Sequence, residues 1–189
     1  MSAPGRPLSL FTGIGVELEY MIVEEGSLAV LPVADGLIHR TTGACQSDVI
    51  RGSLAWSNEL ALHVVELKMN APAISLDGLS GLFQSEIRYL NQQLRAFGGR
   101  LMPTGMHPWM NPQRETRLWP HEYSPIYEAF HRIFDCHRHG WANLQSMHLN
   151  FPFADDTEFA RMHAAIRLVL PLLPVLADRS PFQAGLCKG

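Results

Sequence analysis

Hydrophobic and polar residues alternate along residues 12–23, "TGIGVELEYMIV". A period of two is typical of a β-strand, in which neighbouring side chains point to opposite faces. A second strand is expected over residues 28–33, because "EEGS" with Gly26 predicts a hairpin turn between the two. Residues 34–43 predict a short helix or a loop. Residues 54–70 predict two further strand segments with a bend or a bulge between them.

The hydrophobic period becomes helical after Ser75, which is expected to cap the helix. Gly98 and Gly99 are expected to end it. Residues 100–105 then predict a short strand, and the proline-rich residues 106–125 predict a long irregular loop. The apolar stripe of this helix is formed by Leu76, Leu79, Phe83, Ile87, Leu90, Leu94 and Phe97.

Two more helices, separated by a strand over residues 143–153, complete the pattern. Ser124 and Pro125 predict the start of the first helix, which is expected to run to Gly140. The second is expected to begin at Asp155, with Glu158 in capping-box spacing.

Pro171 and Pro174 should kink or shorten that last helix. The order of elements, with its predicted hairpins, favours an α+β fold in which helices pack on one face of an antiparallel sheet. The length of 189 residues is enough for a single domain with a sizeable core.

The composition of the chain indicates which binding partners and which cellular compartment to expect. The net charge of −3 gives no electrostatic basis for binding nucleic acid or an anionic membrane. Three widely spaced cysteines argue against a disulfide scaffold and predict a reducing cytoplasm, and the N-terminus lacks the apolar region of a signal peptide. Residues 164–177 are apolar, but Arg167 and two prolines predict a segment too short and too interrupted to span a membrane.

Glu17 and Glu19 lie two residues apart in the first predicted strand and therefore face the same side. A lone buried carboxylate is unfavourable by several kcal/mol, and two like charges on one face repel each other. Either this face is open to water, or the pair binds a cation. Carboxylate oxygens suit Mg²⁺ or Mn²⁺.

A second acidic pair, Glu59 and Glu66, is separated by seven residues. In an unbroken strand this spacing places the two side chains on opposite faces, so they converge only if a turn or bulge intervenes. The alternative is a surface glutamate and a strand-end salt bridge between Glu66 and Lys68.

Histidines offer three further candidates. His148 and Asn150 share one face of a predicted strand, where His148 could ligate a metal or contact a phosphate and Asn150 could hydrogen-bond a substrate; a histidine bonded to a neighbouring strand is the alternative. His107, in "GMHPW", is interpreted as part of a structural turn packed on Trp109 rather than as a catalytic residue. "DCHRHG" could form half a zinc site, but a polar helix end is the preferred interpretation of Cys136, His137 and His139.

The sequence has no phosphate loop, dinucleotide fingerprint, H-E-x-x-H or G-x-S-x-G motif. Any nucleotide must therefore be held chiefly through metal ions and basic side chains.

Six segments together resemble the glutamate–cysteine ligase type 2 family. They occur in the family's order, from about Thr12 to Gly185: "GVELEYM", "SNELALHVVELK", "GMHPW", "MHLNFPF", "RLVLPLLPVLA" and "SPFQAG". The resemblance implies a glutamine-synthetase-like catalytic fold, an antiparallel sheet lined with acidic metal ligands. It also implies an ATP-dependent ligase that phosphorylates a glutamate carboxylate and then joins it to an amine. Cysteine is the family's namesake amine, but the amine acceptor of this chain stays open. The choice between Mg²⁺ and Mn²⁺ also stays open, as does the oligomeric state, for which a homo-oligomer is one possibility.

The resemblance also implies roles for individual residues. Glu17, Glu19 and Glu66 match metal ligands, while Glu59 and His148 match positions close to the reacting groups. Asn150 stands where the family has a second histidine, so Asn150 is expected to form a hydrogen bond where that histidine acts as a ligand. Arg167 and Ser180 match positions expected near ATP or substrate, and a helix-packing salt bridge is the alternative for Arg167.

Family members are considerably longer than this chain, which is therefore expected to be the N-terminal part, residues 1–189, of the catalytic domain. Two other functions stay open beside the ligase. One is a non-catalytic domain that keeps the metal-binding face, and the other is a metal-dependent hydrolase that uses the same carboxylates with His148 or His107.

Overall fold

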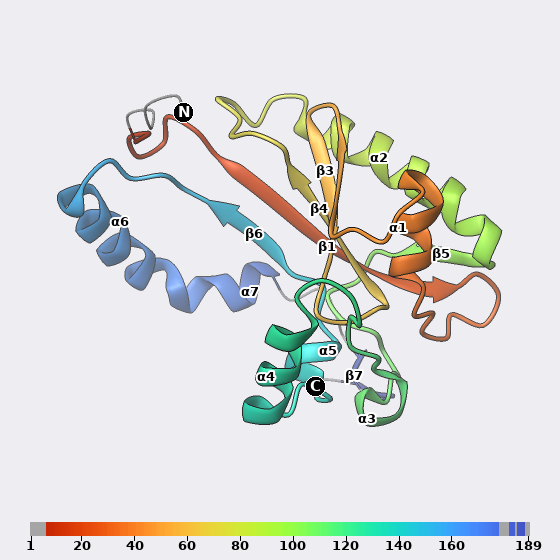
Figure 1. Cartoon of the computed structure of the whole chain (residues 1–189). Helices are drawn as coiled ribbons and strands as arrows, with labels where there is room; N and C mark the ends of the chain where they lie inside the picture. Colours follow the sequence, from red (N-terminus) through yellow and green to blue (C-terminus); the bar gives the residue numbers. More distant parts are fainter. Residues whose placement is uncertain (1–6, 178–181, 184, 188–189) are drawn as a thin grey trace.

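A six-stranded antiparallel sheet forms the centre of the molecule in a computed structural model that describes residues 7–177, 182–183 and 185–187 (Figure 1). The strands lie in the order β2-β3-β4-β1-β5, and β6 also pairs with β1. This arrangement confirms the α+β fold with an antiparallel sheet. The strands are β1 (Gly15–Glu24), β2 (Asp48–Arg51), β3 (Leu54–Asn58), β4 (Val64–Met69), β5 (Gly99–Met102) and β6 (Met147–Asn150).

Strand β1 is the central strand because it is long enough to pair with three others. Residues 17–21 pair with β4 on one side, while residues 15–18 pair with β6 and residues 21–24 with β5 on the other. The strand begins at Gly15, opposite Asn150 of β6. A Cβ atom at Gly15 would lie 3.1 Å from Cβ of Asn150, so the absence of a side chain lets β6 approach closely.

Helices α1 (Ala34–Thr42) and α2 (Leu79–Leu94) cover one face of the sheet (Figure 1). The even-numbered residues of β1 point to this face, and Ile22 is fully buried there. Glu86 of α2 accepts a hydrogen bond from the indole Nε1 of Trp56 at 3.0 Å and pairs with Arg51, which ties α2 to the far strands of the sheet. The core on this face includes Trp56, Val65, Leu67, Phe83, Leu90 and Leu94.

Two predicted features of the first half are wrong. Residues 28–33 form only a single bridge to β1, between Val30 and Val23, instead of a strand. The helix begins at Leu79 after Gly78, not at Ser75. The Ser75 hydroxyl oxygen accepts from the backbone N–H of Asp77 at 3.1 Å, so it stabilises a turn that precedes the helix.

The predicted long loop contains one short helix, α3 (Pro112–Glu115), and leads into α4 (Ser124–Phe134) and α5 (His139–Ala142). Helix α4 begins at the predicted Ser124-Pro125 pair. It ends at Phe134, before the predicted Gly140, because Asp135 adopts a φ of 53°. Gly140 lies inside α5.

The last helical segment consists of α6 (Asp156–Val169), the 3-10 turn η2 (Leu170–Leu172) and α7 (Leu173–Ala177), followed by the two-stranded pair β7 (Phe182–Gln183) and β8 (Leu186–Cys187). The Asp155 carboxylate accepts from the backbone N–H of Glu158 at 2.8 Å, which confirms the predicted cap. The 3-10 turn at Pro171 is the predicted interruption.

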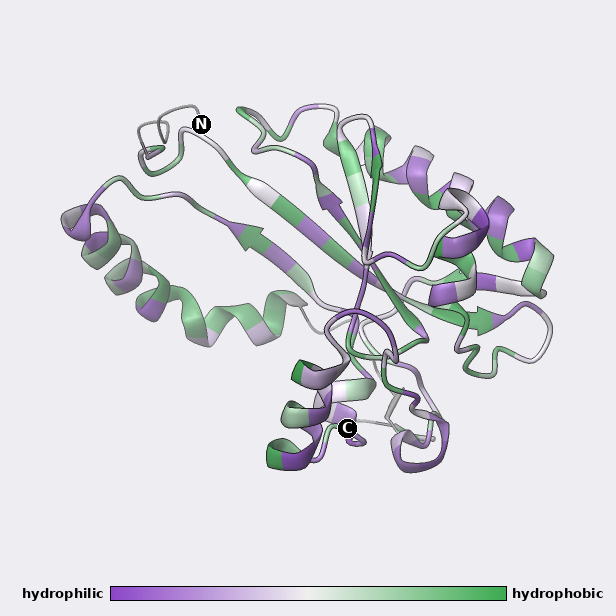
Figure 2. Ribbon diagram, in the orientation of Figure 1, coloured by the Kyte–Doolittle hydropathy of each residue, from purple (hydrophilic) through white to green (hydrophobic). Residues whose placement is uncertain are grey.

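The segment α6–α7 follows β6 and is drawn below it, on the side of the view away from α1 and α2, and its α7 end is strongly hydrophobic (Figures 1 and 2). Leu168 and Val175 are 81% and 80% exposed. By length and composition alone Asp156–Leu176 is long and apolar enough to cross a membrane, so the prediction that this segment is too short to span one is wrong. One such segment among the described residues is weak evidence for a membrane protein.

Candidate functional site

The face of β1 opposite the helical layer carries Glu17 and Glu19. Alternation places them with Met21 and Val23, and these two pack with Met110 at the far end of the strand. The register then sets the neighbours of the glutamates. Glu19 lies opposite Glu66 of β4, and Glu17 lies between Lys68 of β4 and His148 of β6. Like charges directly opposite each other in a sheet are destabilising unless a cation compensates.

Glu59 reaches the same face through the connection between β3 and β4. Strand β3 ends at Asn58, and β4 begins at Val64 and runs back beside it, so Glu59 is the first residue of the connection and Glu66 lies on the returning strand. The connection is held by a backbone hydrogen bond from Leu62 N–H to Arg117 O at 2.9 Å. A turn therefore intervenes between the two glutamates, as their convergence requires.

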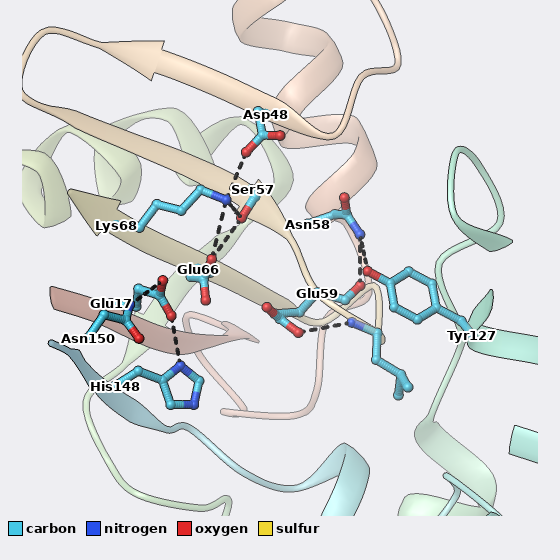
Figure 3. A network of polar contacts seen from close by, with 11 residues as sticks. Glu17, Asp48, Ser57, Asn58, Glu59, Glu66, Lys68, Tyr127, His148 and Asn150 are labelled. Carbon is cyan, nitrogen blue, oxygen red and sulfur yellow. Dashed lines mark hydrogen bonds and ion pairs between the residues drawn. The ribbon is translucent and has the colours of Figure 1, made fainter. Parts of the chain in front are cut away.

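The structure gathers the predicted acidic residues and His148 into two overlapping clusters. Figure 3 shows Glu17, Glu66, His148 and Glu59 close to one another. Within each cluster, one ligand atom from every residue lies within 4.8 Å of the others. Glu66 belongs to both and is 7% exposed. The clusters are Glu17, Glu66 and His148, and Glu19, Glu59 and Glu66.

Hydrogen bonds fix the orientation of each carboxylate. Glu17 accepts from Asn150 Nδ2 at 2.8 Å and lies 3.0 Å from His148 Nδ1, and Glu19 accepts from the backbone N–H of Ser146 at 2.9 Å. Asn150 thus holds Glu17, consistent with a hydrogen bond at a position where the family has a ligand. Glu66 accepts from the Ser57 hydroxyl at 3.1 Å.

The electrostatics of the cluster favour a bound cation. Burial, followed by the charges of Glu19 and Glu66, raises the pKa of Glu59 to about 7. Burial, followed by the charge of Glu17, also raises the pKa of Glu66. Lys68 lies 3.5 Å from Glu66, as in the predicted salt bridge, but it is closer to Asp48, at 2.9 Å.

The negative charge of the carboxylates is therefore only partly compensated by protein groups. The four carboxylates supply oxygen ligands, which suit Mg²⁺ or Mn²⁺, while the imidazole of His148 is a nitrogen ligand more typical of other transition metals. The carboxylates present thus fit the divalent ions expected from the sequence.

Two predicted cofactor-binding residues, Arg167 and Ser180, stand differently in the structure. Arg167 is exposed on α6, and no hydrogen bond or ion pair joins it to the carboxylates or to another helix within the described ranges. The helix-packing salt bridge that was the alternative interpretation of Arg167 is therefore not found among the described residues either. Ser180 lies outside the described residues.

The other histidine candidates have structural contacts. His107 is fully buried, its Nδ1 accepts from the backbone N–H of Met110 at 3.0 Å, and its ring packs edge-on against Trp109. Cys136 is buried just beyond the end of α4, and its backbone N–H donates to His131 Nδ1 at 3.1 Å. The contacts of His107 agree with a structural turn, and Cys136 follows a helix end as interpreted, but His139 begins α5 instead of lying at the end of α4.

Sequence reasoning missed Ser57, Tyr127 and Ser146. Ser57 pairs in register with Glu66, and Tyr127 of α4 accepts a hydrogen bond at its hydroxyl from Asn58 Nδ2 at 3.0 Å. The pairing of β3 with β4, which places Ser57 opposite Glu66, identifies Ser57. No local pattern identifies the other two, because they come from segments distant in the sequence.

Two cavities flank the acidic residues. One, of about 370 Å³, adjoins Glu17 and is lined by residues that include Gly15, Asn70 and Phe151. The other, of about 230 Å³, adjoins Glu19 and Glu59. The candidate site therefore has space for small molecules on both sides of the carboxylates.

Comparison with known proteins identifies relatives of the chain. The family model described as "Glutamate-cysteine ligase family 2 (GCS2)" matches residues 13–189. A protein of Archaeoglobus fulgidus, named only as an uncharacterized protein, is 32% identical over 172 residues. The match covers 91% of this chain and 46% of that relative, so the chain spans about half the length of the curated relative it matches.

Proposed function

Because this chain belongs to glutamate–cysteine ligase family 2, we propose that it provides the metal-binding face of an ATP-dependent carboxylate–amine ligase. The observation that carries the proposal is the convergence of Glu17, Glu19, Glu59 and Glu66 on one face of the sheet. Such a gathering of carboxylates is unfavourable without cations, and transfer of a phosphoryl group between anionic groups requires cations.

Two divalent ions, Mg²⁺ or Mn²⁺, account for the two overlapping clusters. Glu66 would contact both ions, with His148 and Glu17 completing one set and Glu19 and Glu59 the other. When bound, such ions neutralise phosphate charge and align the reacting groups. Asn150, Ser57 and the Ser146 N–H hold the carboxylates in place, which limits the reorganisation needed on binding.

The reaction proposed for the site proceeds in two steps. A carboxylate oxygen of glutamate attacks the γ-phosphorus of ATP, so ADP leaves and an acyl phosphate forms. The amine nitrogen then attacks the acyl carbon, phosphate leaves, and the amine proton passes to solvent or to a nearby base. The products are an amide, ADP and phosphate, with cysteine as one candidate amine.

A phosphate-release assay with ATP, Mg²⁺, glutamate and a panel of amines tests the proposal. Glu66→Gln should abolish turnover and weaken Mn²⁺ binding, because Glu66 belongs to both clusters. Glu25→Gln is the matched control, since Glu25 is exposed and outside both clusters. The assay should be run on this chain and on a polypeptide extended to the length of its relatives.

Three outcomes separate the candidate functions. Turnover that requires both glutamate and an amine supports the ligase. Mn²⁺ binding without turnover at either length supports the non-catalytic metal-binding domain. Amide or ester hydrolysis without ATP supports the hydrolase.

A further inference from the structure

The cavity of about 230 Å³ beside Glu19 and Glu59 has two chemically different ends. Its acidic end is formed by the two carboxylates. Its other walls come from the β3–β4 connection, the start of β4, helices α4 and α5 and the segment after them, and they are largely aromatic and aliphatic. The apolar residues of these walls are Leu60, Ala61, Val64, Tyr127, Phe130, Trp141 and Leu144.

The apolar walls are open to solvent. Phe130, Trp141 and Leu144 are 39%, 40% and 36% exposed, and the Phe130 and Trp141 rings lie 6.2 Å apart between centroids. Exposed aromatic rings gathered beside a polar site are typical of ligand-binding surfaces. A ligand that covered these rings would remove apolar surface from water.

The acidic end favours a ligand that donates hydrogen bonds. The carboxylate oxygens of Glu19 and Glu59 that the proposed metal ion leaves free accept hydrogen bonds, so they suit the N–H groups of an amine. Aromatic faces also attract a cationic ammonium group. An amine with an apolar substituent satisfies both ends of the cavity together.

The size of the cavity fits one small molecule. A volume of about 230 Å³ is smaller than the usual range for drug-sized ligands. The cavity on the other side of the cluster, of about 370 Å³, is larger and includes Asn70 and Asn150 as hydrogen-bonding groups.

We infer that the cavity between Glu59 and the Phe130–Trp141 rings takes the amine substrate, and that it selects amines with an aromatic or large apolar substituent over small polar ones such as cysteine. This inference rests on the proposed ligase function for its catalytic consequence. The binding preference itself does not require turnover.

The catalytic experiment compares 2-phenylethylamine with ethylamine in the extended polypeptide, at saturating ATP, Mg²⁺ and glutamate. Wild type should show at least a tenfold higher kcat/KM for 2-phenylethylamine. Phe130→Ala should lower that value about tenfold and change the value for ethylamine less than twofold, because only the aromatic contact is lost. Phe130→Leu should restore most of the loss.

Ile133→Ala is the matched control, since Ile133 lies on the same helix, is 67% exposed and does not line the cavity. It should leave both amines unaffected. Trp141→Leu is a second test from a different helix and covers the case in which Phe130→Ala fails to fold. Equal kcat/KM for the two amines overturns the inference. A rise in the KM for ATP in Phe130→Ala also overturns it, because that result places the nucleotide base on the rings.

Calorimetric binding of 2-phenylethylamine without ATP separates this inference from the proposed function. If no amine supports turnover, but 2-phenylethylamine binds wild type and binds Phe130→Ala at least tenfold more weakly, the cavity assignment stands and the ligase proposal fails. If the amine binds both proteins equally, or neither, the cavity assignment fails whatever the activity.

Discussion

Replacing Glu59 by glutamine should stabilise the metal-free protein at alkaline pH. Burial and the neighbouring charges of Glu19 and Glu66 raise the pKa of Glu59 from 4.5 to about 7. The folded state therefore binds its proton more tightly than the unfolded state. The free energy of unfolding then falls as the pH rises from about 4.5 through 7, because the folded protein must accept an unfavourable charge.

The size of the effect follows from the pKa. A change from 4.5 to about 7 corresponds to about 3 kcal/mol at pH 8, or roughly 6–12 °C in melting temperature for a domain of this length. Glutamine keeps the shape and the oxygen that accepts from the Leu60 N–H, at 3.3 Å in wild type, but carries no charge. Glu59→Gln should therefore exceed wild type by up to about 3 kcal/mol at pH 8 and equal it near pH 4.5.

Urea unfolding in the presence of a chelator, at several pH values between 4.5 and 8, measures this difference. Adding Mg²⁺ should then stabilise wild type more than Glu59→Gln, since a bound ion at 100 times its Kd contributes about 2.7 kcal/mol. Glu25→Gln is the control and should follow wild type throughout. A Glu59→Gln protein less stable than wild type at pH 8 without metal, or an equal response of both to Mg²⁺, refutes the reasoning.

Three further predictions concern single side chains. Glu19→Gln should weaken Mn²⁺ binding at least tenfold, as measured by calorimetry, because it removes a charged ligand atom from one cluster; unchanged affinity argues against that cluster. Asp155→Ala should lower the free energy of unfolding by about 1 kcal/mol through loss of the α6 cap, while Asp155→Asn should lose less, with thermal unfolding as the measurement. Burial lowers the pKa of His63, so wild-type stability should fall as the pH drops below about 6.5. His63→Gln should show a smaller drop between pH 7 and 5, and identical pH profiles would count against a neutral buried histidine.

Local patterns predicted most of the elements but not all of their ends. The alternation in β1 and the helical stripe of α2 are set by neighbouring residues, so both elements were expected. The strand expected at residues 28–33 is reduced to a single bridge between Val30 and Val23, although Leu31 N–H still donates to Ile22 O at 3.0 Å. The start of α2 moved to Leu79 because Ser75 stabilises a turn instead of a cap.

The sequence by itself determined that Glu17 and Glu19 share a face, because side-chain alternation in a strand depends only on local geometry. Which groups meet them there was decided by the tertiary structure. The hairpin that returns β4 beside β3 brings Glu66 back to Glu59, and the pairing of β6 with β1 places Asn150 against Glu17. Spacing along the chain cannot supply this information, since charges separated by many residues interact only after the backbone has brought them together. Arg167 illustrates the converse, because it lies in a matching motif but no ion pair among the described residues joins it to the carboxylates.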